Sequence, residues 1–446
     1  MRAHQARILL FFYSPLKTKN MKFSLILLLS LCILSCSTTI TKPQDYEQSL
    51  NAQTNEAVKN AALRLNFWNT KIKTDSMQLA SLPYAAEAYG SLFQNTADIQ
   101  YLKAAEKTLK RAADIAAIGK SGHLEALAAN YIKQHRFQEA LSALEQAYII
   151  GGKTKSTTFM LFDVHMELGH YREAQTYLDL TSDFTDFNYL TRLAKWKDYV
   201  GDLDATIHYM EEARNIAEGS NKKDIRMWVY TNLADYYGHA GRLQDSYNHY
   251  LKALQLDPTN AYAKKGIAWI AYSHEANATE ALRILNSIPA EYYSPDYYLL
   301  KAEIAEFMND EGTKKEQLAL YASAVSNPDY GSMYNIPTAL ILAEENGNYD
   351  TALRLAEQEV AARATPETYS LLAHILLLKG DVHKALEISE KYVAGQTFEP
   401  EANYRLAAIY KANNKKDVMA TLEADLRGSH FELGPLTAKR IEQLYQ

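Results

Sequence analysis

Chain-breaking and cross-linking residues are scarce in this sequence. Glycine occurs 18 times, proline 11 times and cysteine twice among 446 residues, which leaves glycine and proline together at roughly half their usual share. Sandwiches and barrels need many tight turns, so this scarcity argues against both. Disorder is also excluded, because it needs few apolar residues and 47% of this chain is apolar. The composition therefore predicts a long, mostly helical, core-forming protein built from several units.

Dense positive charge is missing as well. The formal net charge is −6, and the first 35 residues hold five cations and no acidic residue. Without those five, 42 Lys and Arg stand against 53 Asp and Glu, so the rest of the chain carries −11. Cationic runs are short, at 71–73 and 107–111. Nucleic acid is therefore not expected as a partner, because proteins that bind it usually carry a basic stripe.

One hydrophobic segment lies near the N-terminus. Residues 21–35 begin with Met21 and a single cation, followed by an apolar run too short for a comfortable membrane span. This arrangement is typical of a secretory signal peptide. Since Met21 alone would begin a complete signal, residues 1–20 are interpreted as an over-extended start.

The signal segment ends in Ser35-Cys36. This end resembles the lipobox of bacterial lipoproteins, where a small residue precedes the cysteine that is diacylated and becomes the new N-terminus. The resemblance implies a lipid anchor on Cys36 and removal of Cys32 with the signal. An ordinary cleaved signal and an N-terminal membrane helix are the alternatives.

The residues after Cys36 bear on localisation. No Asp follows Cys36 and no acidic cluster comes next, which by resemblance to sorted lipoproteins implies attachment to the bacterial outer membrane, facing the periplasm. Export to the cell surface stays open. Residues 36–50 are expected to form a short tether.

A short phrase recurs along the remaining chain: a small or turn residue, one spacer, an aromatic or aliphatic residue, two spacers and a small residue. Clear copies end at Ala140, Ala174, Thr206, Ser246, Ala352 and Ala385, and weaker copies end at Ala105, Ala281, Gln317 and Met419. The ten end points are separated by 35, 34, 32, 40, 35, 36, 35, 33 and 34 residues. The period is therefore near 34.

A helical face precedes each phrase and another follows it. Around Gly241, for example, Leu233 and Ala234 lie upstream, and Ser246 and Ala253 lie downstream. The pattern resembles the tetratricopeptide repeat (TPR) family, and its ten copies in phase imply an all-α fold, an α-solenoid of about ten helix-turn-helix repeats. The small residues mark the points where two helices approach closely.

Domain boundaries follow from this repeat. The solenoid is expected over 77–430, with an N-terminal capping helix in 51–76 and a C-terminal capping helix in 431–446. The 40-residue step between repeats is expected to hold a longer loop at 218–224.

Two residues depart from the repeat pattern. Trp269 and Gln317 stand where the first and second helices normally carry small residues. The repeats near 265–325 should therefore pack more loosely or in a shifted register.

Chemical motifs are missing from the repeats. The twelve histidines form no His-Glu-x-x-His arrangement, and the five-residue offset of His165 and His170 puts them on different helical faces, which argues against a shared metal. No nucleophile elbow or phosphate-binding loop occurs, and the nearest match, at 151–154, is interpreted as an inter-repeat turn. The sequence therefore predicts no enzyme, no cofactor and no metal site.

Candidate binding residues follow from the concave groove that a solenoid presents. Counting back from the phrase ends places Asp163, Arg192, Lys195 and Asp235 on the inward face of successive first helices, with Trp228 at the start of one of them. Two interpretations stay open. Either these charges pair across neighbouring repeats, or a partner's acidic group docks on the two cations while Trp228 offers a stacking surface.

Tyrosine is abundant, with 32 copies, and most are expected to fill the core. Tyr334 and Tyr404 are instead expected on the first-helix face that lines the groove, where a ring could stack on a peptide or a sugar.

Together these features predict a membrane-anchored scaffold that binds a protein or peptide partner in its groove. The alternative is a nutrient (glycan)-binding lipoprotein of the starch-uptake type, since such proteins are also helical, lipid-anchored and partly built from these repeats. They carry long insertions that build the glycan site, whereas only a few extra residues near 220 are found here.

Overall fold

The computed structural model describes residues 39–52, 55–72 and 79–446. Every regular element within these ranges is helical, which confirms the all-α prediction. Residues 1–20, the signal segment and Cys36 lie outside the described ranges. None of the helices described is both long enough and apolar enough to cross a membrane.

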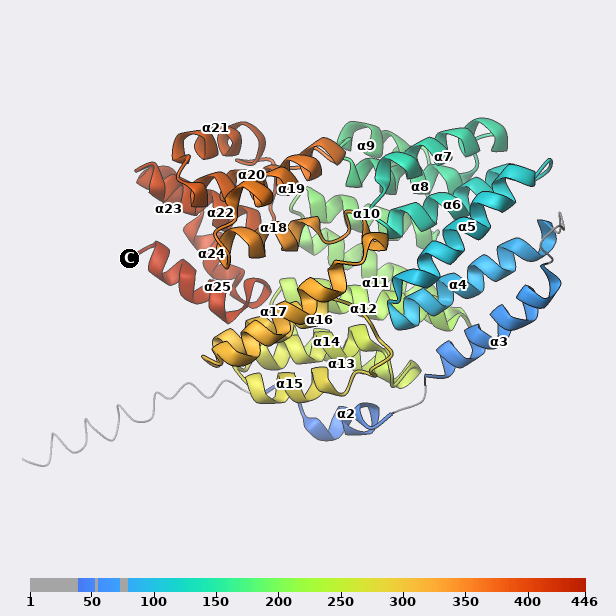
Figure 1. Ribbon diagram of the computed structural model, residues 1–446, viewed down its shortest axis with the longest axis horizontal. Helices are drawn as coiled ribbons and strands as arrows, with labels where there is room; N and C mark the ends of the chain where they lie inside the picture. The colour runs from blue at the N-terminus through green and yellow to red at the C-terminus, as the bar shows by residue number, and fades with distance from the viewer. Residues whose placement is uncertain (1–38, 53–54, 73–78) are drawn as a thin grey trace, which may run out of the picture. The chain divides into compact units, whose positions relative to one another are not determined.

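Ten pairs of packed helices follow one another along the described chain (Figure 1). The pairs are α4 (Leu82–Thr96) with α5 (Ile99–Ile115), α6 (Lys120–Lys133) with α7 (Phe137–Gly151), α8 (Lys155–Glu167) with α9 (Tyr171–Asp179), α10 (Phe187–Tyr199) with α11 (Leu203–Gly219), α12 (Lys223–His239) with α13 (Leu243–Leu256), α14 (Ala261–Trp269) with α15 (Ala278–Asn286), α16 (Asp296–Phe307) with α17 (Glu311–Val325), α18 (Asn335–Glu344) with α19 (Tyr349–Ala362), α20 (Pro366–Lys379) with α21 (Val382–Tyr392), and α22 (Pro400–Ala412) with α23 (Lys416–Ala420).

The remaining elements precede, interrupt or follow these pairs. They are α2 (Pro43–Leu50), α3 (Glu56–Lys71), the 3-10 turns η1 (Leu79–Ser81) and η3 (Pro328–Tyr330), the π-helical turn η2 (Ile270–His274), α24 (Glu423–Gly428) and α25 (His430–Leu444). Helix α3 packs on α4 and thus lies within the predicted capping segment.

The recurring phrase marks the same place in every pair. Each of its ten end points falls in the second helix of a pair, and nine of the ten are buried, Gln317 being the half-buried exception. Ala140 and Ala174 have no exposed surface, because a larger side chain there would hold the two helices apart. The prediction of about ten repeats is confirmed, and the fold is a TPR-type solenoid.

Glycine sets the turn inside a pair where the chain must adopt a left-handed conformation. Gly241 has φ 69°, and the following N–H of Arg242 donates to the carbonyl of Tyr237 at 2.8 Å. This contact satisfies a carbonyl that the end of α12 would otherwise leave unpaired.

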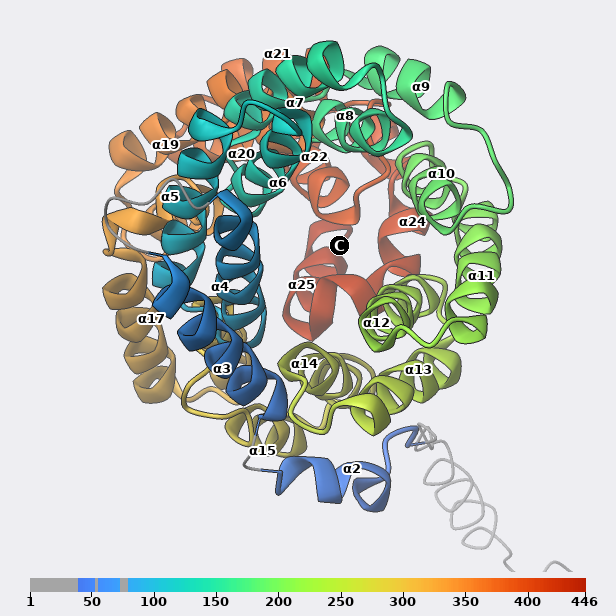
Figure 2. The same cartoon turned by 90° about the vertical axis from the view of Figure 1, so that its right-hand side faces the viewer.

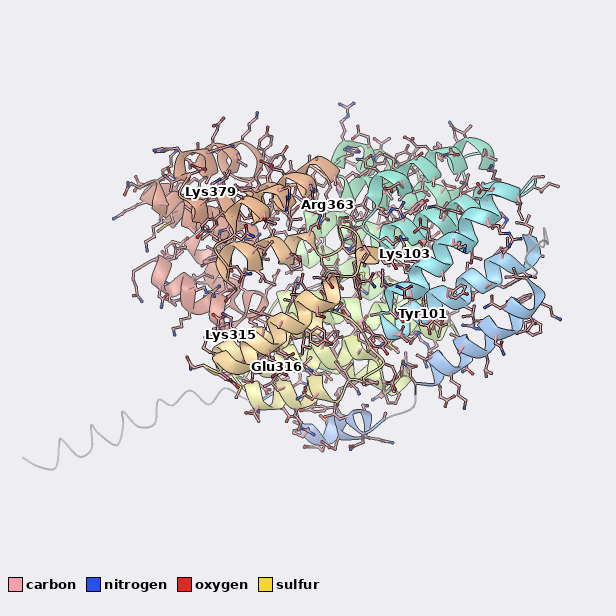
Figure 3. All side chains as sticks on the ribbon, in the orientation of Figure 1. Tyr101, Lys103, Lys315, Glu316, Arg363 and Lys379 are labelled. Atoms are coloured by element: carbon pink, nitrogen blue, oxygen red, sulfur yellow. The ribbon has the colours of Figure 1, made fainter. Side chains whose placement is uncertain are left out.

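First helices line the inside of the superhelix and second helices form its outside, as Figure 2 shows for residues 40–446. Successive turns of this superhelix touch. Arg363, labelled in Figure 3, lies 3.9 Å from Glu167 and stacks over Phe137 at 5.6 Å. Nearby, a Cβ at Gly169 would come within 2.9 Å of the carbonyl oxygen of Ala364. The repeats therefore coil tightly enough for distant ones to pack together.

The segment predicted as a tether is structured from residue 40 onward. The N–H groups of Ile40 and Thr41 donate to the carboxylate of Glu275 at 2.6 and 2.7 Å. Tyr46, only 1% exposed, donates its hydroxyl to Glu280 at 2.6 Å. Helix α2 thus packs on the outside of the solenoid, which corrects the prediction of a tether for residues 40–50. Burial of the apolar side chains in this segment offsets the conformational entropy that the segment loses when it becomes ordered.

The longer loop predicted at 218–224 is also corrected. Helix α11 ends at Gly219 and α12 begins at Lys223, and both helices run for 17 residues. The extra residues therefore lengthen this helix pair, and the connection itself stays short.

The C-terminal helix does more than cap the last repeat. Figure 2 shows α25 inside the ring of first helices, and it contacts η2, α12 and α16 as well as α22 and α24. It is broken at Gly434, where φ is 76°. The kink lets the carbonyl of Phe431 accept hydrogen bonds from Trp269 Nε1 at 3.0 Å and from Ser273 Oγ at 2.6 Å.

Candidate functional site

The candidate site is the inner groove, the surface that the first helices present to the inside of the superhelix. Helix α25 fills part of it. Three cavities open along the rest, and we call them the entrance cavity, the charged cavity and the C-terminal cavity.

The charged cavity, of about 590 Å³, is lined by α8, α10 and α12. It brings together four of the predicted residues, Asp163, Arg192, Lys195 and Trp228. Arg192 Nη2 lies 2.6 Å from Asp163 Oδ2, and its Nε donates to the carbonyl of Phe159 at 3.1 Å while the guanidinium stacks on the Phe159 ring. The Arg192 fork is therefore already held by atoms of the preceding repeat.

Lys195 is held in the same way. Its Nζ lies 2.8 Å from Glu167 Oε1 in the preceding repeat. Burial disfavours the charged amine, but Glu167 and Asp163 outweigh that effect and keep the pKa of Lys195 above its usual range. These distances match the interpretation in which the charges pair across repeats, so an acidic ligand would have to displace a carboxylate.

Asp235 supports two tyrosines. It accepts hydrogen bonds from the hydroxyls of Tyr250 and Tyr262, the latter at 2.7 Å. Burial raises the pKa of Asp235 in spite of these two donors. Its main effect is therefore to fix both rings, and Tyr262 in particular lies where a ligand could reach it.

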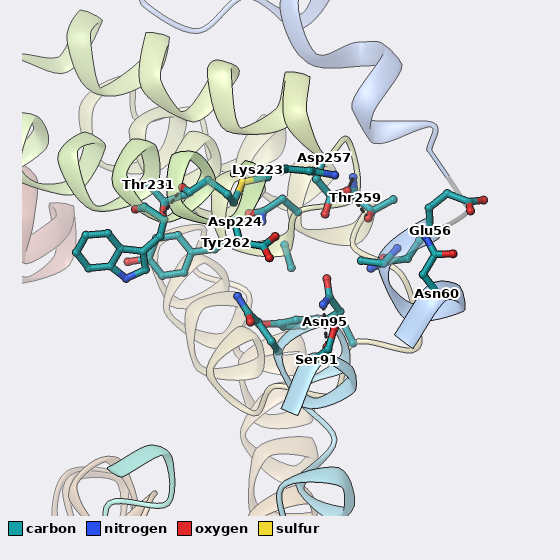
Figure 4. A pocket seen from close by; sticks show the side chains of 18 of the residues that line it. Glu56, Asn60, Ser91, Asn95, Lys223, Asp224, Thr231, Asp257, Thr259 and Tyr262 are labelled. Atoms are coloured by element: carbon teal, nitrogen blue, oxygen red, sulfur yellow. Dashed lines mark hydrogen bonds between the residues drawn. The ribbon is translucent and has the colours of Figure 1, made fainter. Parts of the chain in front are cut away.

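The entrance cavity is the largest of the three, at about 890 Å³, and lies between α3 and α4 on one side and α12 and α14 on the other. Trp228 lines both this cavity and the charged cavity, so the two adjoin at this residue. Trp228 is 44% exposed and Tyr262 is 46% exposed. Figure 4 shows polar side chains around the hollow, contributed by Glu56, Asn60, Ser91, Asn95, Asp224 and Thr231.

The C-terminal cavity, of about 470 Å³, lies between α25 and the first helices α16, α18, α20 and α22. The predicted Tyr404 lines it. Glu344 accepts a hydrogen bond from His374 Nε2 at 2.8 Å, and Arg440 of α25 lies 3.1 Å from Glu306 of α16. This cavity is closed on one side by the chain's own C-terminus.

Tyr334 does not line any of these three cavities, contrary to the prediction. Helix α18 begins one residue later, so Tyr334 lies at the helix start and not on its inward face. Its ring packs edge-on against Tyr321 and Tyr330. Burial raises its pKa, in line with a role in the core.

The histidine pair was also misjudged from its spacing. His165 Nδ1 and His170 Nδ1 lie 3.2 Å apart, because α8 ends at Glu167 and the turn carries His170 back toward it. The His165 ring stacks on Tyr177 at 5.3 Å. Within the described chain no group of three His, Cys, Asp or Glu side chains could hold a metal ion.

Sequence reasoning missed the entrance cavity, although one signal was present. Tyr262 follows Trp228 by 262 − 228 = 34 residues, one full period. The phrase ends of these two repeats are 35 residues apart, so the two aromatic residues differ by one position in the repeat, but they lie on consecutive first helices. What the sequence could not show is that Asn60 and Asn95 face them, because superhelical coiling brings α3 and α4 opposite α12 and α14.

No protein-family model matches the chain, and no curated protein matches it. Among solved structures, it is similar to a TPR protein from Parabacteroides merdae, with 14% identity over 60% of this chain and 94% of that one, at a TM-score of 0.38. It is also similar to the human IFIT1 dimer with m7Gppp-AAAA, with 13% identity, 75% and 77% coverage and a TM-score of 0.45. Yeast Tom70 is similar at 13% identity, 86% and 96% coverage and a TM-score of 0.37.

TM-scores at this level do not assign a fold, so the assignment rests on features of this chain. A period near 34, paired helices and buried small residues at equivalent positions define a TPR-type solenoid.

Proposed function

We propose that the protein is a membrane-anchored scaffold that binds a protein or peptide partner in its inner groove, and that it performs no catalysis itself. The observation that carries the proposal is the position of α25. A segment of the chain's own polypeptide already lies in the groove, contacting first helices on several sides. The groove surface is therefore suited to hold a helical peptide.

The contacts that α25 makes in the groove support this proposal. The groove supplies an indole N–H and a hydroxyl to one backbone carbonyl, that of Phe431. The Phe431 ring packs at Gly238, where a Cβ would come within 2.8 Å of it. An aromatic anchor beside a captured backbone group is a common way to recognise a peptide.

The membrane anchor rests on the sequence around Cys36, and it has its own test. A clickable fatty acid should label the wild-type protein but not Cys36→Ser, and the variant should move to the soluble periplasmic fraction. An unlabelled wild-type protein would remove the anchor from the proposal.

Partner binding is tested by photo-cross-linking in cells. A benzoylphenylalanine placed at Asn188, exposed in the charged cavity, should form a discrete adduct with a partner. The matched control is the same residue at Gln146, exposed on the outer helix α7. Equal adducts at both sites, or none at Asn188, would contradict binding in the groove.

The finer hypothesis, an acidic group docked at Arg192 and Lys195, is tested by changing both to alanine. The Asn188 adduct should then be lost while Tm changes little, because all four side chains of these ion pairs keep contact with solvent, and solvent-exposed ion pairs contribute about 1 kcal/mol or less each. A clearly lower Tm with the adduct retained would show that the two cations are structural.

A further inference from the structure

The entrance cavity combines aromatic faces with amides, and this combination separates it from the rest of the groove. Trp228 and Tyr262 lie on consecutive first helices, and each keeps nearly half of its surface exposed. Large aromatic rings are normally covered, so two exposed rings in one hollow suggest a ligand surface.

Both rings are held in place before any ligand arrives. The Tyr262 hydroxyl donates to Asp235, which also accepts from Tyr250. The Trp228 ring meets Phe187 edge-on at 6.0 Å between centroids. A ligand that stacks on these rings loses little free energy to ordering them.

The polar lining is dominated by side-chain amides. Asn60, Gln94, Asn95 and Asn232 all line the cavity. The amide nitrogens of Asn95 and Asn232 donate to backbone carbonyls in their own helices, each at 2.8 Å. Those bonds orient the two amides, and no donor within the described residues occupies their Oδ1 atoms. The site therefore offers oriented acceptors at Asn95 and Asn232, and further amide donors and acceptors at Asn60 and Gln94.

The charge of the cavity is close to balanced. Its lining includes the carboxylates of Glu56, Asp224 and Asp257 and the cations of Arg64 and Lys223. Two cations are too few to bind an anionic polymer. Leu63, an apolar residue of the lining, is 61% exposed, so it does not form an enclosed pocket of the kind that anchors a peptide side chain.

We propose that the entrance cavity binds a neutral oligosaccharide. The C–H faces of sugar rings stack on Trp228 and Tyr262, and their hydroxyls exchange hydrogen bonds with the surrounding amides and carboxylates. A volume of about 890 Å³ lies within the range of cavities that hold small ligands. The glycan-binding alternative predicted from the sequence involves the same class of ligand. Sugar binding in the entrance cavity is inferred from the cavity, and it does not depend on peptide binding elsewhere in the groove.

The test is calorimetric titration of the full chain in detergent with three neutral probes, maltoheptaose, cellohexaose and chitohexaose. At least one probe should bind with a dissociation constant below about 1 mM. Trp228→Ala should weaken that binding at least about tenfold, because stacking on the exposed ring is lost. Phe184→Ala is the matched control, since Phe184 is 60% exposed but lies outside the cavity, and it should leave binding unchanged.

Other outcomes overturn the proposal. It fails if none of the probes binds, or if Trp228→Ala binds like the wild type with an unchanged circular dichroism spectrum. It also fails if a neutral Gly-Ser hexapeptide binds more tightly than every sugar and loses affinity in Trp228→Ala, which would assign the cavity to a peptide. Should Trp228→Ala fold poorly, Asn95→Ala with Asn60→Ala provides a second measure at exposed or half-buried positions. Cross-linking from Asn188 reports on the scaffold function separately, so either proposal can fail alone.

Discussion

Two stretches of the solenoid follow the same repeat with very different regularity. In the regular stretch, α6 to α13, the small residues at the phrase ends are buried, from Ala140 to Ser246. Helix α13 alone buries seven residues, whereas α17 in the irregular stretch, α14 to α17, buries only Tyr321. Gln317 replaces the small residue there, and its buried side-chain oxygen has no hydrogen-bond partner among the described residues.

The irregular stretch makes hydrogen bonds to the C-terminal helix, which also packs on α12 of the regular stretch. Trp269, at a position normally small, is followed by the π-helical turn η2, and such turns often mark functional positions. The turn directs Trp269 and Ser273 toward the Phe431 carbonyl. Here the departures from the repeat pattern at Trp269 and η2 coincide with a long-range contact. The regular stretch also makes long-range contacts, since Arg363 approaches Glu167 and Phe137, so conformity to the pattern does not exclude them.

The largest effect is expected from overpacking the regular stretch. Ala140→Leu inserts three extra carbons between α6 and α7, where Ala140 has no exposed surface, and should cost about 1 to 3 kcal/mol of unfolding free energy. Urea denaturation followed by circular dichroism measures it. Ala361→Leu is the control, on an exposed face of the second helix α19, and should change the midpoint little. Equal midpoints for both variants would contradict the close approach of the paired helices.

A smaller effect is expected in the irregular stretch. Trp269→Phe with Ser273→Ala removes both donors to the Phe431 carbonyl, and should cost about 1 to 2 kcal/mol, because a typical hydrogen bond contributes about 1 kcal/mol net. Hydrogen exchange should quicken in α25 and stay unchanged in α6 to α11. Ser142→Ala changes an exposed residue of α7, and it should alter neither the unfolding free energy nor the hydrogen exchange of α25. If hydrogen exchange quickened equally across the chain, α25 and the regular repeats would unfold as a single cooperative unit.

The smallest effect concerns pH and a buried carboxyl group of the irregular stretch. Glu303, on α16, accepts a hydrogen bond from Tyr272 at 3.1 Å, and burial raises its pKa to about 7 from 4.5. The folded chain therefore binds more protons than the unfolded chain between these values. The stability that the neutral carboxyl contributes is full below about pH 4.5 and is lost as pH rises through about 7.

Glu303→Gln should accordingly raise Tm at pH 8 by a few degrees and change it little at pH 4. Thermal melts at the two pH values measure this difference. Exposed Glu316, labelled in Figure 3, is the control as Glu316→Gln. A rise of the same size at both pH values would show that removing the charge is not the cause.

Several features could be predicted because they depend only on near neighbours in the chain. The phrase ends at Ala140 and Ala385 mark buried helix contacts, since a residue of that size is needed wherever two adjacent helices meet. The inward placement of Arg192 follows from the same counting. Its partner Asp163 is one repeat away, so pairing across repeats was one of the two interpretations that the sequence allowed.

Other features escaped prediction because local patterns do not encode them. Residues 40–50 look like a tether until Glu275 is found to accept their N–H groups. A continuous helix would place His165 and His170 on different faces. The chain instead reverses between them and brings their rings together. Tyr334 was misplaced by one residue at a helix start, which is enough to turn a side chain away from the groove.

The amino-acid sequence by itself determined the helix pairs and their period, because a 34-residue repeat buries its small and apolar residues against the next repeat whatever lies further along the chain. Only the tertiary structure decided which turns of the superhelix touch, where α25 lies and which amides face Trp228. Those outcomes depend on a small rotation added at every repeat. The sum of these rotations sets whether distant residues such as Gly169 and Ala364 meet, and no single repeat determines that sum.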